Sequence, residues 1–205
     1  MSGPPVSPDV VWQQGEVPRA ERWRAAGVHG ATVWLTGLPG SGKSTVANAL
    51  LAALTSRGVL AYSLDGDNLR HGLNGDLGFS ADDRAENVRR VAEVARLCAD
   101  AGLVVSVPVI SPYRAGRDHA RSIHAASGLV FLEVFVDAPL EVCEARDPKG
   151  LYRRARAGEL RGLTGVDDPY EPPTDPDLVV ATAELTPPDA AAANVAALEA
   201  RGAVA

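Results

Sequence analysis

Short apolar runs alternate with amphipathic segments along most of the chain. Five of these runs have strand length, at residues 31–36, 59–64, 103–110, 130–136 and 178–181, and the first is also rich in β-branched residues. Between them, apolar residues recur at helical spacing from residue 44 up to Gly58 and from Ser80 up to Gly102, and the proline pair at 187–188 opens an Ala-rich helix. Alternation of strand and helix predicts an α/β fold, a doubly wound parallel five-stranded sheet with helices on both faces.

Two segments depart from this alternation. Residues 1–29 are predicted to form an N-terminal extension that is partly disordered, since positions 1–17 are rich in proline, serine and polar groups, with a short helix over 19–26. Residues 146–171 are rich in Arg, Gly, Asp and Pro and show no apolar periodicity, which is typical of a mobile lid. The main domain is therefore predicted to span residues 30–205, with no second domain.

Charge and composition narrow the class of function. The 205 residues carry a formal net charge of −6, which argues against a basic surface for nucleic acid or anionic membrane. Only two cysteines occur, Cys98 and Cys143, too few for a disulfide framework or a metal site. The sequence has no run of 18 apolar residues and no signal-peptide pattern at its N-terminus. We therefore expect a soluble, cytoplasmic protein with a small-molecule substrate, no nucleic acid and no membrane.

A glycine-rich turn separates the first predicted strand from the helix that follows it. It matches the phosphate-loop motif G-x-x-x-x-G-K-[ST] with Gly37, Leu38, Pro39, Gly40, Ser41, Gly42, Lys43 and Ser44. Small residues let backbone N–H groups converge on phosphate oxygens at the positive end of the helix. Lys43 is predicted to reach the β- and γ-phosphates of ATP, Ser44 to hold Mg²⁺, and Thr45 to complete the ATP site.

Kinases, GTP-dependent switches and motor ATPases share this motif, so other residues must separate them. A switch also needs a guanine-reading [NT]-K-x-D, and lysine occurs only at positions 43 and 149 among twenty basic residues. Asp147 and Gly150 fit the D-x-x-G pattern of switches, but no apolar strand directly precedes them. In a chain that otherwise uses arginine, lysine is expected where only a compact ammonium fits. The pattern favours a small-molecule kinase.

Two carboxylates, Asp65 and Asp67, directly follow the second predicted strand. In an open parallel sheet the binding crevice lies beyond the carboxyl ends of the strands, so both should lie beside the phosphate loop. A carboxylate there can accept the proton of an attacking hydroxyl or hold a magnesium-bound water. A solvated Asp-Gly turn would have the same sequence. Arg84 and Asn87, three residues apart on the long predicted helix, either bind an anion or form a solvated face.

Six segments of distinctive sequence lie between residues 64 and 171. They read LDGDNLR from residue 64, LGFS from 77, DRAEN from 83, ISPYR from 110, DPKGLY from 147 and TGVDDPYE from 164. In this order they resemble the adenylylsulfate kinases, and the resemblance covers about residues 30–185. It implies a P-loop NTPase fold of the nucleoside-monophosphate-kinase type, transfer of the ATP γ-phosphoryl to the 3′-hydroxyl of adenosine 5′-phosphosulfate, and a homodimer.

The resemblance also implies roles for the acceptor-side residues. Asp67 would be the catalytic carboxylate, with Asp65 nearby as a further substrate-binding residue. The phosphosulfate would bind to Arg70, Arg84 and Asn87, and paired arginines suit such an anhydride anion. These roles agree with the position of both carboxylates after the second predicted strand.

Apolar contacts and the lid complete the implied acceptor site. Phe79 would stack on the substrate adenine, Ile110 would line its pocket, and Lys149 would belong to a lid closing over both nucleotides. Two positions depart from the family pattern. Pro39 stands where serine is frequent, which should change stiffness more than chemistry. Leu163 stands where a second aromatic ring against the adenine is common, which should weaken substrate binding.

Ser111 matches a serine described in this family as phosphorylated, which would make it a catalytic residue. A serine that hydrogen-bonds substrate or backbone beside Pro112 fits equally well, because in-line transfer needs no enzyme nucleophile. Two wider alternatives also stay open. One is a kinase of the same fold for another small alcohol or nucleotide, and the other is a regulatory nucleotide-binding module without turnover.

Overall fold

The computed structural model describes residues 9–11, 13 and 15–205, and the disorder predicted over residues 1–17 falls mainly on residues outside this range. Five strands form one parallel sheet in the order β2-β3-β1-β4-β5. They are β1 (Ala31–Thr36), β2 (Ala61–Ser63), β3 (Val104–Pro108), β4 (Val130–Asp137) and β5 (Leu178–Ala181). The predicted five-stranded parallel sheet is confirmed, with β2 and β3 shorter than their apolar runs.

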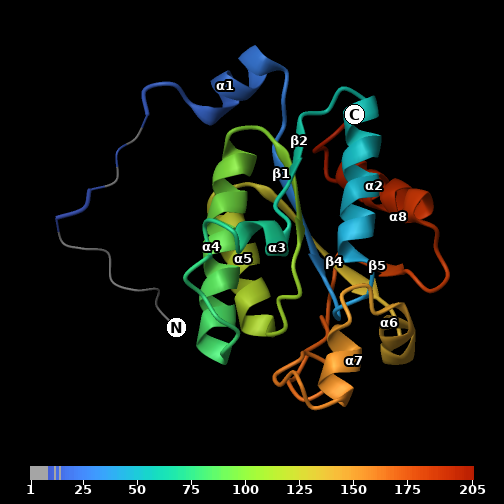
Figure 1. The fold of residues 1–205 in the computed structure, drawn as a ribbon. Helices are drawn as coiled ribbons and strands as arrows, with labels where there is room; N and C mark the ends of the chain where they lie inside the picture. The colour runs from blue at the N-terminus through green and yellow to red at the C-terminus, as the bar shows by residue number, and fades with distance from the viewer. Residues whose placement is uncertain (1–8, 12, 14) are drawn as a thin grey trace.

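Helices cover both faces of this sheet (Figure 1). They are α1 (Arg19–Ala26), α2 (Lys43–Ser56), α3 (Gly66–Leu69), α4 (Ala81–Asp100), α5 (Arg114–Ala126), α6 (Leu140–Arg146), α7 (Leu151–Arg156) and α8 (Pro187–Ala200). Helices α2 and α8 pack together on one face, and α4 and α5 pack together on the other. The doubly wound arrangement is therefore confirmed as well.

Side chains of the central strand β1 alternate between the two faces. Val33 and Leu35 are fully buried in the cluster under α2 and α8, whereas Trp34 is fully buried in the cluster under α4 and α5. Because successive strand residues point to opposite faces, a strand covered on both sides must be apolar along its length. This burial explains the continuous apolar run that identified the strand.

The two ends of α4 show how local sequence fixes this long helix. The hydroxyl of Ser80 accepts a hydrogen bond from the backbone N–H of Asp83 at 3.1 Å and so caps the N-terminus of the helix. At the other end, Asp100 pairs with Arg19 and Arg22 of α1. The short helix predicted over residues 19–26 is therefore present and tied to α4.

Within the described residues, no helix combines the length and apolar character needed to span a membrane.

The segment predicted as a lid contains a helix that the spacing of its apolar residues does not indicate. Helix α7 begins after Asp147, whose carboxylate accepts hydrogen bonds from the backbone N–H groups of Tyr152 and Arg153 at 3.1 and 3.0 Å. Tyr152 and Leu163 pack with Cys143 in a third apolar cluster, separate from the two sheet faces. The lid lies beyond the carboxyl ends of the strands, and this cluster joins it to α6 (Figure 1).

Candidate active site

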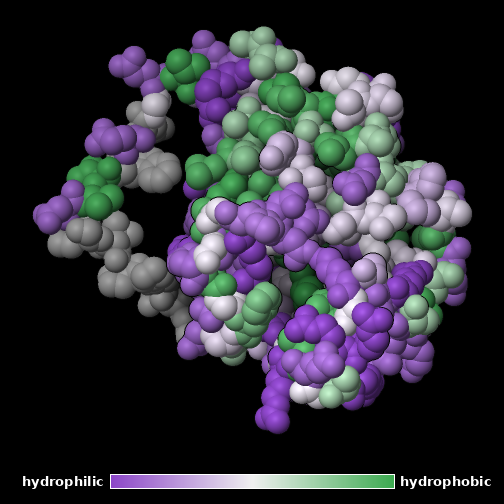
Figure 2. Space-filling view, viewed as in Figure 1, coloured by the Kyte–Doolittle hydropathy of each residue, from purple (hydrophilic) through white to green (hydrophobic). Residues whose placement is uncertain are grey.

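A cavity of about 970 Å³ lies beyond the carboxyl edge of the sheet. The phosphate loop and the start of α2 form one wall, the segments after β2 and β3 form another, and the lid covers them. In the space-filling view, the surface of the lid is mostly hydrophilic, and hydrophobic residues are visible in a hollow beside it (Figure 2). The arrangement places the crevice where the sequence predicts it, at the carboxyl ends of parallel strands.

The phosphate loop contains two glycines whose backbone conformations are readily adopted only by glycine. Gly40 and Gly42 have φ values of 75° and 97°, and a Cβ on Gly40 would lie 2.9 Å from the carbonyl oxygen of Cys143. Helix α2 begins within the motif, at Lys43, and no side chain caps its first N–H groups. These unpaired donors and the positive end of the helix make the loop an anion site.

Lys43 is nearly buried within this loop. Its ammonium donates hydrogen bonds to the carbonyl oxygens of Gly37 and Leu38 at 3.0 and 2.8 Å. Burial disfavours the charged form and lowers the pKa of Lys43 to about 8, although the neighbouring Asp65 opposes the shift. An anionic ligand in the loop would restore the charge, so the site is electrostatically poised for phosphate.

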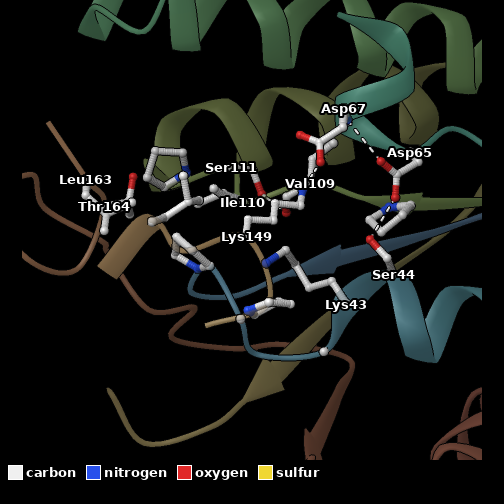
Figure 3. Close-up of a pocket in the computed structure, with 18 of the residues that line it drawn as sticks. Lys43, Ser44, Asp65, Asp67, Val109, Ile110, Ser111, Lys149, Leu163 and Thr164 are labelled. Carbon is white, nitrogen blue, oxygen red and sulfur yellow. Dashed lines mark hydrogen bonds and ion pairs between the residues drawn. The ribbon is translucent and has the colours of Figure 1, made fainter. Parts of the chain in front are cut away.

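Ser44 and Asp65 meet across the crevice (Figure 3). The Ser44 hydroxyl donates to one Asp65 carboxylate oxygen at 2.7 Å, and the other oxygen accepts from the N–H of Asp67 at 2.9 Å, which caps α3. A hydroxyl and a carboxylate are the oxygen ligands that Mg²⁺ takes while keeping several waters. No group of three or more His, Cys, Asp or Glu side chains arranged for a metal occurs in the described part of the chain. Because both donors are oxygen atoms, the pair formed by Ser44 and Asp65 fits magnesium better than a metal that prefers nitrogen or sulfur.

Asp67 faces the lid rather than the phosphate loop. Its carboxylate pairs with the ammonium of Lys149, and both side chains are more than half exposed. The structure thus brings together the acceptor-side carboxylate and the lid lysine, which are 82 residues apart in the sequence. An exposed pair of this kind is only weakly stabilising, so a bound substrate can replace it at little cost.

Arg84 and Asn87 do not lie on a solvated helix face, because both are at least nine-tenths buried and line the cavity. The guanidinium of Arg84 donates to the backbone oxygens of Phe79 and Gly162 at 2.9 and 2.5 Å and to the hydroxyl of Thr164 at 2.5 Å. Arg84 therefore ties α4 to the lid.

Arg70 and Phe79 both line the cavity and contact each other. The Arg70 guanidinium carbon lies 4.3 Å from the centroid of the Phe79 ring. Burial, and then the charge of Arg84, lower the pKa of Arg70, so an anion beside it would be stabilising. The Phe79 side chain is 69% exposed although it lines the cavity, which leaves an aromatic surface available for stacking.

Ser111 is buried in the loop after β3. Its backbone has a φ of 41°, an uncommon value for a residue with a side chain. Its hydroxyl accepts a hydrogen bond from the indole N–H of Trp34 at 3.1 Å, and only 2% of the residue is exposed. Ile110, just before it, lines the cavity. Ser111 lines the cavity as well, but the indole N–H of Trp34 gives its hydroxyl a structural partner inside the protein.

Sequence reasoning missed the buried ion pair that holds this loop. Arg117 donates to Glu133 at 2.7 Å, to the carbonyl oxygen of Ser111 at 2.6 Å and to that of Glu171 at 2.7 Å. One side chain therefore joins α5, β4, the Ser111 loop and the end of the lid. The signal was available, since Glu133 is the one charged residue within the apolar run 130–136.

Leu163 lines the cavity but is 7% exposed, because it also packs against the third apolar cluster. In that cluster the hydroxyl of Tyr152 donates to the carbonyl oxygen of Pro39 at 2.8 Å. Pro39 and Leu163 are the two positions that depart from the family pattern, and both contact this third apolar cluster, which we call the apolar base of the lid. This link between phosphate loop and lid has no counterpart in the local sequence pattern.

The cavity continues past the phosphate loop to residues that the sequence did not single out. Arg146 donates to the carbonyl oxygen of Thr182 at 2.6 Å, and the Thr182 hydroxyl donates to that of Ser41 at 2.6 Å. Two lid arginines, Arg154 and Arg161, also line the cavity. These residues follow no motif, so only the fold reveals that they meet.

The sheet order, the phosphate loop between β1 and α2, and the carboxylates after β2 define the fold of a P-loop kinase. Solved kinases share it, among them a gluconokinase from Sinorhizobium meliloti with a TM-score of 0.53 at 20% identity. The chain belongs to the adenylylsulphate kinase family, whose model matches residues 29–181. The expected family is therefore confirmed.

Relatives agree along most of the chain. An APS kinase of Mycobacterium tuberculosis, solved in complex with AMPPNP and APS, is 53% identical with a TM-score of 0.82, over 84% of this chain and 99% of that one. An adenylyl-sulfate kinase of Marinobacter nauticus is 51% identical over 94% of this chain and 96% of its own length. The chloroplastic adenylyl-sulfate kinase 4 of Arabidopsis thaliana is 55% identical over 84% of this chain, which spans only 55% of that longer protein.

Proposed function

We propose that the protein is an adenylylsulfate kinase, which transfers the γ-phosphoryl group of ATP to the 3′-hydroxyl of adenosine 5′-phosphosulfate and forms 3′-phosphoadenylyl sulfate and ADP. The observation that carries this proposal is one cavity with a phosphate loop on one side and an aromatic ring, a buried arginine and a carboxylate on the other. Family membership and the M. tuberculosis relative, solved with an ATP analogue and APS together, support it.

On the donor side, the triphosphate of ATP would bind to the loop at residues 37–44, with Lys43 on the β- and γ-oxygens and Thr45 at the start of α2. Mg²⁺ would be held by Ser44, with Asp65 beside it, and would neutralise charge on the phosphates. The nucleoside would extend towards Arg146 and Thr182, where the cavity continues.

On the acceptor side, Arg70, Arg84 and Asn87 would bind the phosphosulfate. Phe79 and Ile110 would contact the adenine. The substrate 3′-oxygen attacks the γ-phosphorus, the bond from that phosphorus to the β,γ-bridging oxygen breaks, and Asp67 accepts the hydroxyl proton. Direct transfer is favoured over a phosphoserine route, because the Ser111 hydroxyl is buried and bonded to Trp34.

The test is a turnover assay with Mg-ATP and two acceptors, adenylyl sulfate and adenosine monophosphate. We expect adenylyl sulfate to be phosphorylated far faster, since Arg70 and Arg84 would bind the sulfate-bearing group that only it carries. Equal rates on the two acceptors would favour a broader kinase of the same fold. ATP binding without turnover on either acceptor would favour a regulatory module.

Assembly and location are proposed from the same resemblance. We expect a homodimer in the cytoplasm, although an APS kinase of Thiobacillus denitrificans, 32% identical over 91% of this chain, is described as hexameric. Light scattering on the purified protein distinguishes a dimer from a monomer or hexamer.

A further inference from the structure

Asn74 is fully buried although it lies in a polar loop, between the two acceptor-side residues Arg70 and Phe79. Its side-chain amide nitrogen donates a hydrogen bond to Oδ1 of Asn87 at 3.0 Å. Its own Oδ1 has no hydrogen-bond partner among the described residues. A buried carbonyl without a partner is costly, and each such group in a native protein calls for an explanation.

The direction of this hydrogen bond determines what Asn87 offers to a ligand. Because Oδ1 of Asn87 accepts from Asn74, its amide nitrogen is the group left for the cavity, and no described residue accepts from that nitrogen. If the amide nitrogen of Asn87 instead donated to Oδ1 of Asn74, the two N–H groups of Asn74 would be buried and unpaired. In the observed arrangement only the carbonyl oxygen of Asn74 is unpaired. Unpaired buried N–H groups are the rarer of the two.

A side-chain amide can turn about its last torsion and exchange its donor and acceptor ends. An Asn87 without the Asn74 contact could present either end to a ligand. With that contact it presents N–H donors only. Such a group is complementary to phosphate or sulfate oxygens, and it cannot accept a hydrogen bond from a hydroxyl or amine.

We propose that Asn74 is a positioning residue for the acceptor, which holds the amide of Asn87 so that only its N–H donors face the cavity. The oxyanion selected at this point would be the phosphosulfate, so the inference rests on the proposed function. A different role for Asn74 would be to anchor the loop that carries Arg70 and Phe79, and the experiment must separate the two.

The first measurement is calorimetric binding of adenylyl sulfate to Asn74→Leu, which keeps a similar volume but has no donor. Loss of a well-oriented hydrogen bond to a charged ligand predicts about tenfold weaker binding, with kcat and the KM for ATP within about twofold of wild type. Asn194→Leu is the matched control. Asn194 is equally buried, also has an unpaired Oδ1, and donates only to the Ala190 carbonyl of its own helix. It should leave affinity for adenylyl sulfate unchanged.

A double-mutant cycle separates orientation from anchoring. If Asn74 acts through the amide of Asn87, then Asn74→Leu added to Asn87→Ala should weaken binding no further. An equal weakening in both backgrounds would establish the loop anchor and overturn the proposal, as would unchanged binding in Asn74→Leu alone. Should Asn74→Leu fail to fold, Asn74→Ser serves in the same cycle. A wild-type protein that binds adenylyl sulfate without phosphorylating it would contradict the proposed function and leave this inference intact.

Discussion

The donor and acceptor sides of the cavity are built in different ways. The phosphate-binding part of the donor side is one continuous stretch, residues 37–44, whose geometry follows from two glycines and the start of a helix. The acceptor side comes from separate segments after β2, on α4, after β3 and in the lid, and contacts such as that of Arg84 with Gly162, 78 residues away, hold them together. Binding of the ATP phosphates therefore needs little beyond local structure, whereas the choice of acceptor depends on the whole fold.

The largest effect on turnover is expected in the phosphate loop, on the donor side. Lys43→Ala should lower turnover by about 10²–10³-fold or more, because the lysine would follow charge on the transferring phosphoryl group. Steady-state kinetics measure it, and circular dichroism should show an unchanged fold. Lys43→Arg should also be impaired, since the site is nearly closed and suits a compact ammonium. Near-normal turnover in Lys43→Ala would show that the loop is not the ATP site.

Removing the acceptor carboxylate should have the next largest effect. Asp67→Asn should lower kcat by about 10²-fold, the range of a positioned acid-base group, with little change in the KM for ATP. Asp76→Asn is a matched control, because Asp76 is equally exposed, pairs with Arg90 and does not line the cavity. Similar rates for the two variants would remove Asp67 from the chemistry.

Binding of ATP, on the donor side, is expected to depend on pH. The pKa of Lys43 is lowered to about 8 in the free protein, and phosphates beside it would raise it again in the complex. ATP binding should therefore take up a proton near pH 8 to 9, and affinity should fall about tenfold from pH 7 to pH 9. Calorimetry in buffers of different ionisation enthalpy measures the uptake. Lys43→Arg should show none, and adenylyl sulfate binding should not follow this profile.

Leu163→Phe should strengthen the binding of adenylyl sulfate a few-fold. One side of Leu163 is filled by the third apolar cluster, so the larger ring should extend into the cavity. An aromatic contact contributes about 0.5–1.5 kcal/mol beyond buried area, and adenylyl sulfate should bind a few-fold more tightly while ATP binding hardly changes. Unchanged or weaker binding of adenylyl sulfate would show that Leu163 does not face the adenine.

Ser111→Ala should have the smallest effect on turnover. Removing the hydroxyl leaves the Trp34 indole N–H without its partner, which should lower the free energy of unfolding by about 1–3 kcal/mol. Most of kcat should remain, because direct transfer does not use this residue. Complete loss of activity, together with a phosphoserine in the wild type that passes its phosphate to adenylyl sulfate, would establish the covalent route instead.

The same contrast explains how much could be predicted from sequence. The strands were found because burial on both faces requires continuous apolar runs, and the phosphate loop because its residues are adjacent. The sequence indicated Arg84 and Asn87 as candidates, but their burial depends on the lid and on Asn74. It gave no reason to join Arg117 to the Ser111 loop.

The apolar base of the lid was missed for a physical reason. Tyr152 and Leu163 bury their side chains against α6 and the phosphate loop, so the contacts do not produce a periodic pattern within residues 146–171. Pairwise contacts between distant segments leave no local signature. Helix α7, with six residues, is also too short to show one.

Both lysines of the chain line the cavity, one in the phosphate loop and one in the lid. An acylating reagent that modifies side-chain amines therefore has two targets in this protein, and the arginines elsewhere stay inert. Lys43 combines a lowered pKa of about 8 with a nearly buried position, whereas Lys149 is more than half exposed and pairs with Asp67. The relative labelling of the two, read by mass spectrometry, would report loop occupancy and lid closure separately, without any turnover.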